Sequence, residues 1–177
     1  HISAAAGAMT WMFYEWVKFG KPTALGSVTG MVAGLGTITP ASGFVGPAGA
    51  LVIGIIAGAI CFNAVIIIKQ KFKIDDSLDV FPVHGVGGIC GTILVGFFAS
   101  KEPGIFSGQG GWGHEAIVIS DQLQIQLTAV VATAAYTALA TFVILKLVDV
   151  VTGLRVDSQT ETQGLDLDSH GETGYNL

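Results

Sequence analysis

The stretch PAGALVIGIIAGAICFNAVIII, residues 47–68, contains no charged side chain. A helix needs about 20 apolar residues to cross the hydrocarbon core of a bilayer, so this stretch is long enough to span a membrane. Four further apolar segments occupy residues 2–17, 23–39, about 78–99 and about 121–149. The sequence therefore predicts an all-α, polytopic transmembrane bundle with five spans in this chain. At about 1.5 Å per residue the last segment would exceed about 40 Å, so it should be tilted or project beyond the bilayer.

The composition is typical of a membrane protein rather than a soluble domain. Hydrophobic residues make up 51% of the 177 residues and charged residues only 12%, whereas a soluble domain carries about 25% charged residues. The mean hydropathy is +0.66. The charges divide the chain into a membrane region, 1–154, and a polar tail, 155–177. The tail has the composition of a disordered, solvated segment, although its piece GLDLDSHGETGY favours an ordered one.

The basic residues indicate how the spans are oriented. Seven fall on one side of an alternating topology: Lys18, Lys21, Lys69, Lys71, Lys73, Lys146 and Arg155. Only Lys101 falls on the other side. Because short loops rich in lysine and arginine stay in the cytoplasm, the tail is expected to be cytoplasmic. Residue 1 then lies near the outer face, and because the chain does not begin with methionine, we expect further spans upstream of it.

Many of the 25 glycines recur at intervals of four residues within the apolar segments. They are Gly26, Gly30 and Gly34, then Gly54 and Gly58, then Gly87 and Gly91. Small residues at this spacing allow helix backbones to approach closely. The spacing predicts a compact bundle with a narrow interior.

Three carboxylates precede the fourth span: Asp75, Asp76 and Asp79. Asp76 or Ser77 can cap the helix, and the third carboxylate would lie in its first turn, where a negative charge is favoured. The simplest interpretation is capping together with ion pairs to Lys71 and Lys73. The alternatives are a structural clamp or a cation site on the cytoplasmic side.

His84 is the one histidine in the stretch LDVFPVHGVGGICG, residues 78–91. A histidine in an apolar segment can be a core residue whose hydrogen bonds are satisfied. Within a membrane, however, ionisable residues usually face an interior cavity and mark a pathway. A neutral imidazole both donates and accepts a hydrogen bond, whereas burying a bare cation among apolar groups costs on the order of tens of kcal/mol. The residue type suits a small, polar, uncharged permeant.

Three stretches carry a family resemblance. They are GMVAGLGTITPASGFVGPAGALVIGIIAG (30–58), DVFPVHGVGGICG (79–91) and GLRVDSQTETQGLDLDSHGETGY (153–175). In this order they resemble the eighth and ninth helices, the tenth-helix signature and the cytoplasmic tail motif of the ammonium transporter family (Amt/Mep, distantly Rh). The resemblance implies an eleven-helix inverted-repeat fold, of which this chain would form helices seven to eleven and the tail.

The same resemblance implies a transport mechanism. In that family ammonium loses its proton, and neutral ammonia passes along an apolar pore past two paired histidines, with net movement of ammonium charge. Carried over by position, His84 is the second pore histidine. Val80 and Val32 line the cytoplasmic half of the channel, and Thr39 lies near its outer part. The first histidine is expected upstream, so this chain alone should not form a pore.

Partners and location also follow from the resemblance. It implies a homotrimer, each protomer with its own pore, in the lipid of the cell membrane, and in bacterial members a PII-type signalling protein on the cytoplasmic face. Residues expected to build or regulate that face are Asp75, Asp76, Asp79, Gly164, Asp166, His170, Gly171 and Tyr175. No cofactor, metal ion or nucleic acid is expected.

Other functions remain open from the residues themselves. A nitrogen sensor or a channel for neutral gases such as ammonia and CO2 would use the same pore. An intramembrane hydrolase acting through Asp79 or His84 would need a second catalytic partner, and the chain has no G-x-S-x-G pattern. Cys61 and Cys90 are interpreted as small buried side chains. No two histidines show metal-ligand spacing; His114 is expected in a solvated outer loop and His170 in local hydrogen bonds.

Overall fold

The structure, a computed structural model, describes residues 1–100, 104–106 and 117–174. Within these ranges the regular secondary structure is entirely helical, which confirms the prediction of an all-α protein. The chain forms two compact units, His1–Val131 and Ala132–Leu177. Their boundary falls within the long helix α5 (Ile119–Val151). The division at residue 154 between membrane region and tail stays a prediction.

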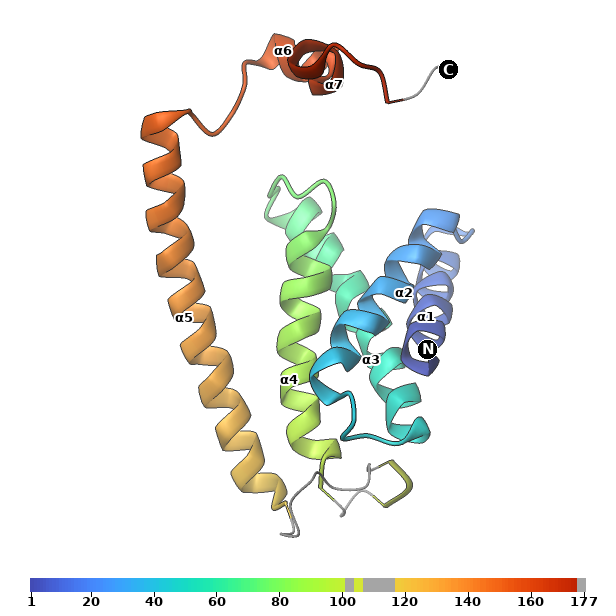
Figure 1. Cartoon of the computed structure of the whole chain (residues 1–177). Helices are drawn as coiled ribbons and strands as arrows, with labels where there is room; N and C mark the ends of the chain where they lie inside the picture. Colours follow the sequence, from blue (N-terminus) through green and yellow to red (C-terminus); the bar gives the residue numbers. More distant parts are fainter. Residues whose placement is uncertain (101–103, 107–116, 175–177) are drawn as a thin grey trace. The chain divides into compact units, whose positions relative to one another are not determined.

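Four packed helices precede α5 in the first unit (Figure 1). They are α1 (Ile2–Phe19), α2 (Ala24–Ile38), α3 (Pro47–Ile66) and α4 (Gly87–Phe98). Two π-helical turns adjoin them, Ile67–Lys71 after α3 and Phe81–Val86 before α4. Short 3-10 turns occupy Thr39–Ala41 and Gly104–Phe106. The fourth predicted span, about 78–99, thus corresponds to the π-helical turn Phe81–Val86 followed by α4.

In the part of the chain that the structure describes, four helical stretches are long and apolar enough to cross a membrane: Ala24–Ala41, Pro47–Lys71, Phe81–Phe98 and Ile119–Val151. The prediction of a polytopic bundle is thereby confirmed. The first predicted span corresponds to α1, which is not among the four. It is 18 residues long and carries Glu15 and Lys18 near its C-terminal end, so it is less apolar than the others.

Local sequence explains where the helices begin and end. Gly20 terminates α1 with a φ of 81°, a left-handed conformation that glycine adopts without a steric penalty. Thr23 is the N-cap of α2, and its hydroxyl accepts the N–H of Gly26 at 2.9 Å. Pro47 opens α3, because proline has no N–H to leave unpaired in a first turn.

The repeated glycines bring the helix backbones into contact, as their spacing predicts. A Cβ added to Gly30 would lie 2.7 Å from the carbonyl oxygen of Gly7, and one added to Gly34 would lie 2.8 Å from the carbonyl carbon of Ser3. The Ser3 hydroxyl also donates to the Gly34 carbonyl at 2.8 Å. In α3, a Cβ at Gly58 would lie 2.8 Å from the Gly7 carbonyl oxygen. Larger side chains at these positions would force α1 away from α2 and α3.

Two apolar clusters form the interior of the first unit. One contains Trp11, Ala33, Cys61, Phe62 and Val83, and the other contains Ala41, Ile53, Val95, Phe98 and Ala99. Cys61 is fully buried, Cys90 is partly buried, and both are free thiols, as interpreted from the sequence. By contrast, α5 has no buried residue and exposes apolar side chains along its length. Its 33 residues correspond to about 50 Å, and apolar side chains around a whole helix are typical of a membrane span.

The second unit carries two short helices after α5, namely α6 (Ser158–Gln163) and α7 (Leu165–His170). Gly153, Gly164 and Gly171 all have positive φ angles, and they end α5, separate α6 from α7 and end α7. Two short helices thus occupy part of the described tail, which agrees with the ordered interpretation of GLDLDSHGETGY.

Candidate functional site

His84 lies within the π-helical turn Phe81–Val86 that leads into α4. The turn begins where the carboxylate of Asp76 accepts the backbone N–H groups of Val80 and Phe81, each at 2.9 Å. Of the two capping residues that the sequence allowed, Asp76 is the one used. The turn contains Pro82, which has no N–H to donate, and π-helical turns are often found at functional sites.

The imidazole of His84 is exposed within this chain and faces α2 at Gly36. A Cβ placed on Gly36 would lie 3.9 Å from Nδ1 of His84 and 3.9 Å from the carbonyl oxygen of Val83. The backbone of the turn is buried from behind, because Val83 is only 3% exposed and belongs to the cluster around Cys61. The Cys61 thiol donates to the Val83 carbonyl at 3.9 Å. The turn is thus held by α3 on one side while its histidine points outward.

The other predicted pore residues lie in α2 or directly beside α2 and the π-helical turn. Val32 is partly buried and packs against the same cluster around Cys61. Val80 lies four residues before His84 and is 52% exposed. The Thr39 hydroxyl donates to the carbonyl of Leu35 in its own helix at 2.7 Å. The pore roles of all four residues stay predictions.

Gly36 is a site residue that the sequence reasoning missed. It follows Val32 by four residues on one face of α2 and precedes Thr39, the first residue of the 3-10 turn after α2, by three. This spacing can be read from the sequence, but a glycine has no functional group that would suggest a role in a site. Only the packing of α2 against the turn shows that this face meets His84.

One of the three carboxylates before α4 has a different partner from the one expected. Asp79 pairs with Lys69, with 2.9 Å between Oδ1 and Nζ, and not with Lys71 or Lys73 as predicted. Asp79 also lies just before the helix rather than in its first turn, with a φ of 54°. Lys69 lies in the π-helical turn Ile67–Lys71, farther from Asp79 along the chain than the two lysines that the sequence favoured.

A cleft of about 300 Å³ lies between the ends of α1, α2 and α3 next to this ion pair. It is lined by both members of the pair and by Glu15, whose side chain is nearly buried. Glu15 accepts the backbone N–H of Thr23 at 2.7 Å and the Thr23 hydroxyl at 3.1 Å. Gly26 leaves room for this carboxylate, since a Cβ there would overlap it. Glu15 thus fastens the start of α2 to the end of α1, a role that the sequence reasoning did not assign.

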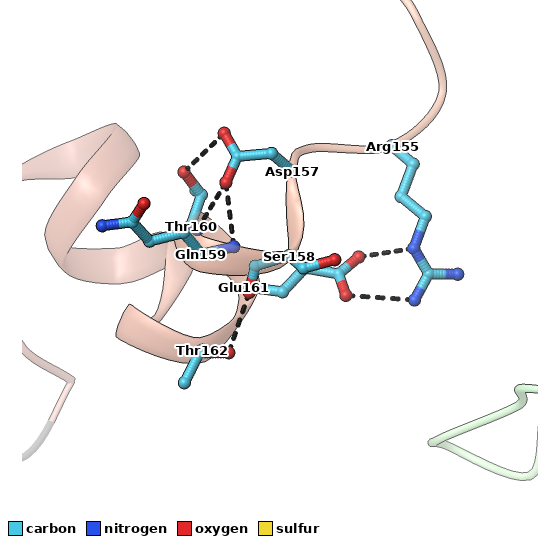
Figure 2. Close-up of polar contacts among 7 residues, drawn as sticks. All are labelled: Arg155, Asp157, Ser158, Gln159, Thr160, Glu161 and Thr162. Carbon is cyan, nitrogen blue, oxygen red and sulfur yellow. Dashed lines mark hydrogen bonds and ion pairs between the residues drawn. The ribbon is translucent and has the colours of Figure 1, made fainter.

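The tail has its own polar contacts (Figure 2). Asp157 caps α6 by accepting the N–H groups of Gln159 and Thr160, both at 2.9 Å, and Arg155 forms a two-pronged ion pair with Glu161. The N–H of Thr160, followed by that of Gln159, lowers the pKa of the Asp157 carboxyl. The Arg155 guanidinium lowers the pKa of Glu161.

The predicted tail residues cluster around α7. Gly164 and Gly171 bound the helix with φ angles of 99° and 65°. Asp166 accepts the N–H of Gly174 at 3.2 Å and that of Leu167 at 2.9 Å, and these bonds lower the pKa of its carboxyl. His170 is the last residue of α7, and Tyr175 lies outside the described residues. Any regulatory role of these residues stays a prediction.

Metal chemistry has no candidate ligand set in residues 1–100, 104–106 and 117–174, where no three histidine, cysteine or carboxylate side chains gather suitably. His114 lies outside these ranges. The group beside the imidazole of His84 in α2 is Gly36.

A sequence model of the Ammonium Transporter Family matches residues 1–175. The chain belongs to this family. The family resemblance inferred from the three motifs is thereby confirmed.

Named relatives of the ammonium transporter family match nearly the whole chain. An ammonium transporter of Bacillus subtilis is 43% identical over 175 residues, which are 99% of this chain and 42% of the relative. Ammonium transporter Amt1 of Archaeoglobus fulgidus is 45% identical over 175 residues, which are 99% of this chain and 43% of Amt1. The chain thus spans about two fifths of the length of the curated relatives it matches.

Solved structures share the fold of this family member. The crystal structure of Candida albicans Mep2 has a TM-score of 0.74 and 34% identity, covering 89% of this chain and 35% of Mep2. A structure titled Sensor Amt Protein has a TM-score of 0.76 and 25% identity, and the match covers 94% of this chain and 39% of that protein. These matches support a polytopic membrane protein of the Amt/Mep type.

Proposed function

We propose that the protein containing this chain transports ammonium across a membrane. Family membership over residues 1–175 and relatives named as ammonium transporters support this function. The observation that carries the proposal is the imidazole of His84, which lies in a helical stretch apolar enough to cross a membrane. An ionisable group at such a place usually marks a pathway.

In the proposed mechanism ammonium is deprotonated before it enters the apolar part of the pore. His84 and a second histidine, from a part of the protein upstream of this chain, hold neutral ammonia by hydrogen bonds. Val80 and Val32 line the pathway on the cytoplasmic side, and Thr39 lies toward the outer side. The apolar lining disfavours a bare cation, because its burial costs on the order of tens of kcal/mol. The proton crosses separately, so that ammonium charge moves overall.

The proposed setting is a homotrimer in the plasma membrane with a cytoplasmic tail. The support for the orientation is the distribution of basic residues, seven on one side of the membrane against one on the other. The tail residues Gly164, Asp166 and Gly171 then shape the cytoplasmic face, together with Asp75, Asp76 and Asp79. That face is the proposed docking place of a PII-type signalling protein.

A second candidate is a nitrogen sensor or a channel for neutral gases. The 25% identity to the protein titled Sensor Amt Protein is the observation in its favour. An enzymatic function, by contrast, has no support from the family, and we propose that the protein is not an enzyme. A sensor or gas channel would differ from the transporter in carrying no ammonium-dependent current.

The test combines uptake of methylammonium with electrical recording on the whole protein. The transporter predicts saturable ammonium-dependent flux and current, whereas an absence of current contradicts electrogenic transport and favours the second candidate. His84→Ala should abolish flux or alter the discrimination against sodium and potassium ions. Val150→Ala, at a position 87% exposed near the end of α5, is the control and should leave both unchanged. If His84→Ala behaves like the control, His84 does not line the pathway.

A further inference from the structure

Most glycines inside the helices of the first unit have a packing reason. Besides Gly30 and Gly34, a Cβ on Gly91 would lie 2.9 Å from the carbonyl carbon of Thr37, and one on Gly54 would lie 2.7 Å from the Cβ of Ala6. These positions are where two helix backbones meet. Glycine destabilises a helix interior relative to alanine, and close packing of the helices offsets that cost.

Gly36 lies in the interior of α2 without such a reason. Apart from the nearby backbone of its own helix, a Cβ there would meet no described atom closer than 3.9 Å, and the two atoms at that distance are His84 Nδ1 and the Val83 carbonyl oxygen. Both belong to the π-helical turn before α4. An alanine would therefore fit and would favour the helix, yet the sequence has the residue without a side chain. What the glycine leaves is room for one methyl group beside the imidazole.

We propose that Gly36 is a specificity-determining residue, whose missing side chain sets the width of the pathway beside His84. This inference rests on the proposed function of His84 in ammonium transport. A methyl group at position 36 would touch Nδ1 at ordinary van der Waals distance and occupy space that a permeant needs. The larger substrate methylammonium, with one more carbon than ammonium, loses more from such narrowing.

Two substitutions in the whole protein test the proposal by their fluxes of ammonium and methylammonium. Gly36→Ala should lower the flux of methylammonium relative to that of ammonium by about tenfold, a typical discrimination for one carbon atom in a tight site. Gly36→Ser adds a hydroxyl that can donate to Nδ1, so it should also lower ammonium flux below that of Gly36→Ala. Equal flux ratios in Gly36→Ala and the parent protein would overturn the proposal, and so would equal ammonium fluxes in the two variants.

Gly34→Ala is the matched control on the same helix. Its methyl group would meet the backbone of Ser3, so this variant should reach the membrane in smaller amounts, while the flux ratio of the protein that remains is unchanged. Gly36→Ala should reach the membrane in parental amounts. A loss of membrane protein in Gly36→Ala would show that the space is filled, and would overturn the proposal.

His84→Ala, measured alongside, separates this inference from the proposed function. If His84→Ala leaves flux and ion discrimination unchanged, the proposed role of the histidine fails. If His84→Ala changes them while the Gly36 variants do not, only the role of Gly36 fails.

Discussion

Lys69 and Asp79 form an ion pair across the loop that joins α3 to α4, with 2.9 Å between Nζ and Oδ1. The two side chains are 39% and 20% exposed. Asp79 has a left-handed backbone, with a φ of 54°, and its carbonyl accepts the N–H of Val83 at 3.0 Å. The pair therefore fixes the residue from which the turn carrying His84 begins.

Substitution of Asp79 should separate the ion pair from the backbone conformation. Asp79→Asn removes the charge but tolerates the left-handed conformation, so it should lower the free energy of unfolding by about 0.2–1 kcal/mol. Asp79→Ala should cost roughly 1–2 kcal/mol more, because alanine is strained at this φ. Denaturant unfolding of the purified protein measures both. Lys71→Ala is the control, and a larger loss from it than from Asp79→Asn would contradict the pairing.

The carboxylate of Glu15 should be needed to hold the start of α2. Glu15→Ala leaves the N–H of Thr23 without its 2.7 Å acceptor, so we expect a loss of about 1–3 kcal/mol in the free energy of unfolding. Glu15→Gln keeps one acceptor oxygen and should lose less. Thr29→Val removes an exposed hydroxyl that bonds only within α2, and it should change the stability by less than about 0.5 kcal/mol. Equal losses from Glu15→Ala and Thr29→Val would refute this role.

Gly164 should be required for the separation of α6 from α7. Its φ of 99° and ψ of 130° fall in a region that is nearly restricted to glycine, so Gly164→Ala should destabilise the tail by about 1–3 kcal/mol. Gly174→Ala is the matched control, because a Cβ there meets nothing within 4 Å and its φ is not positive. Hydrogen exchange of the α6 and α7 amides measures the effect. Faster exchange in both variants, or in neither, would argue against a conformational requirement at Gly164.

The capping of α6 by Asp157 should depend on pH. The N–H of Thr160 holds the pKa of this carboxyl below its ordinary value of 3.8. Its contribution to the stability of α6 is therefore fully present above about pH 4 and is lost as the pH falls through the lowered pKa. Hydrogen exchange of the α6 amides, corrected for the intrinsic rate, should show less protection at low pH. Asp157→Asn still caps the helix but does not titrate, so its protection should not follow this pH dependence.

The membrane helices follow directly from the sequence because their cause is local. The uncharged run at 47–68 and its counterparts are long enough to span a bilayer. Glycines at four-residue spacing indicated close helix packing, and Gly30 and Gly34 lie against α1 as expected. The motif around His84 identified the family, which the match over residues 1–175 confirms.

The partners of polar groups could not be predicted because they depend on how separate helices meet. Lys71 and Lys73 are closer to Asp79 along the chain than Lys69 is, yet Lys69 is its partner in the folded chain. The role of Glu15 was missed because its contact with Thr23 forms only when the start of α2 folds back against the end of α1.

The sequence by itself determined that the chain spans a membrane, that its helices pack closely and that it belongs to the ammonium transporter family. Hydrophobic length, residue spacing and motif order are all properties of the chain read in one dimension. The tertiary structure alone decided that Gly36 lies beside the imidazole of His84. The reason is physical: a glycine has no side chain from which a contact could be predicted, so its role depends on which groups of the folded chain lie beside it.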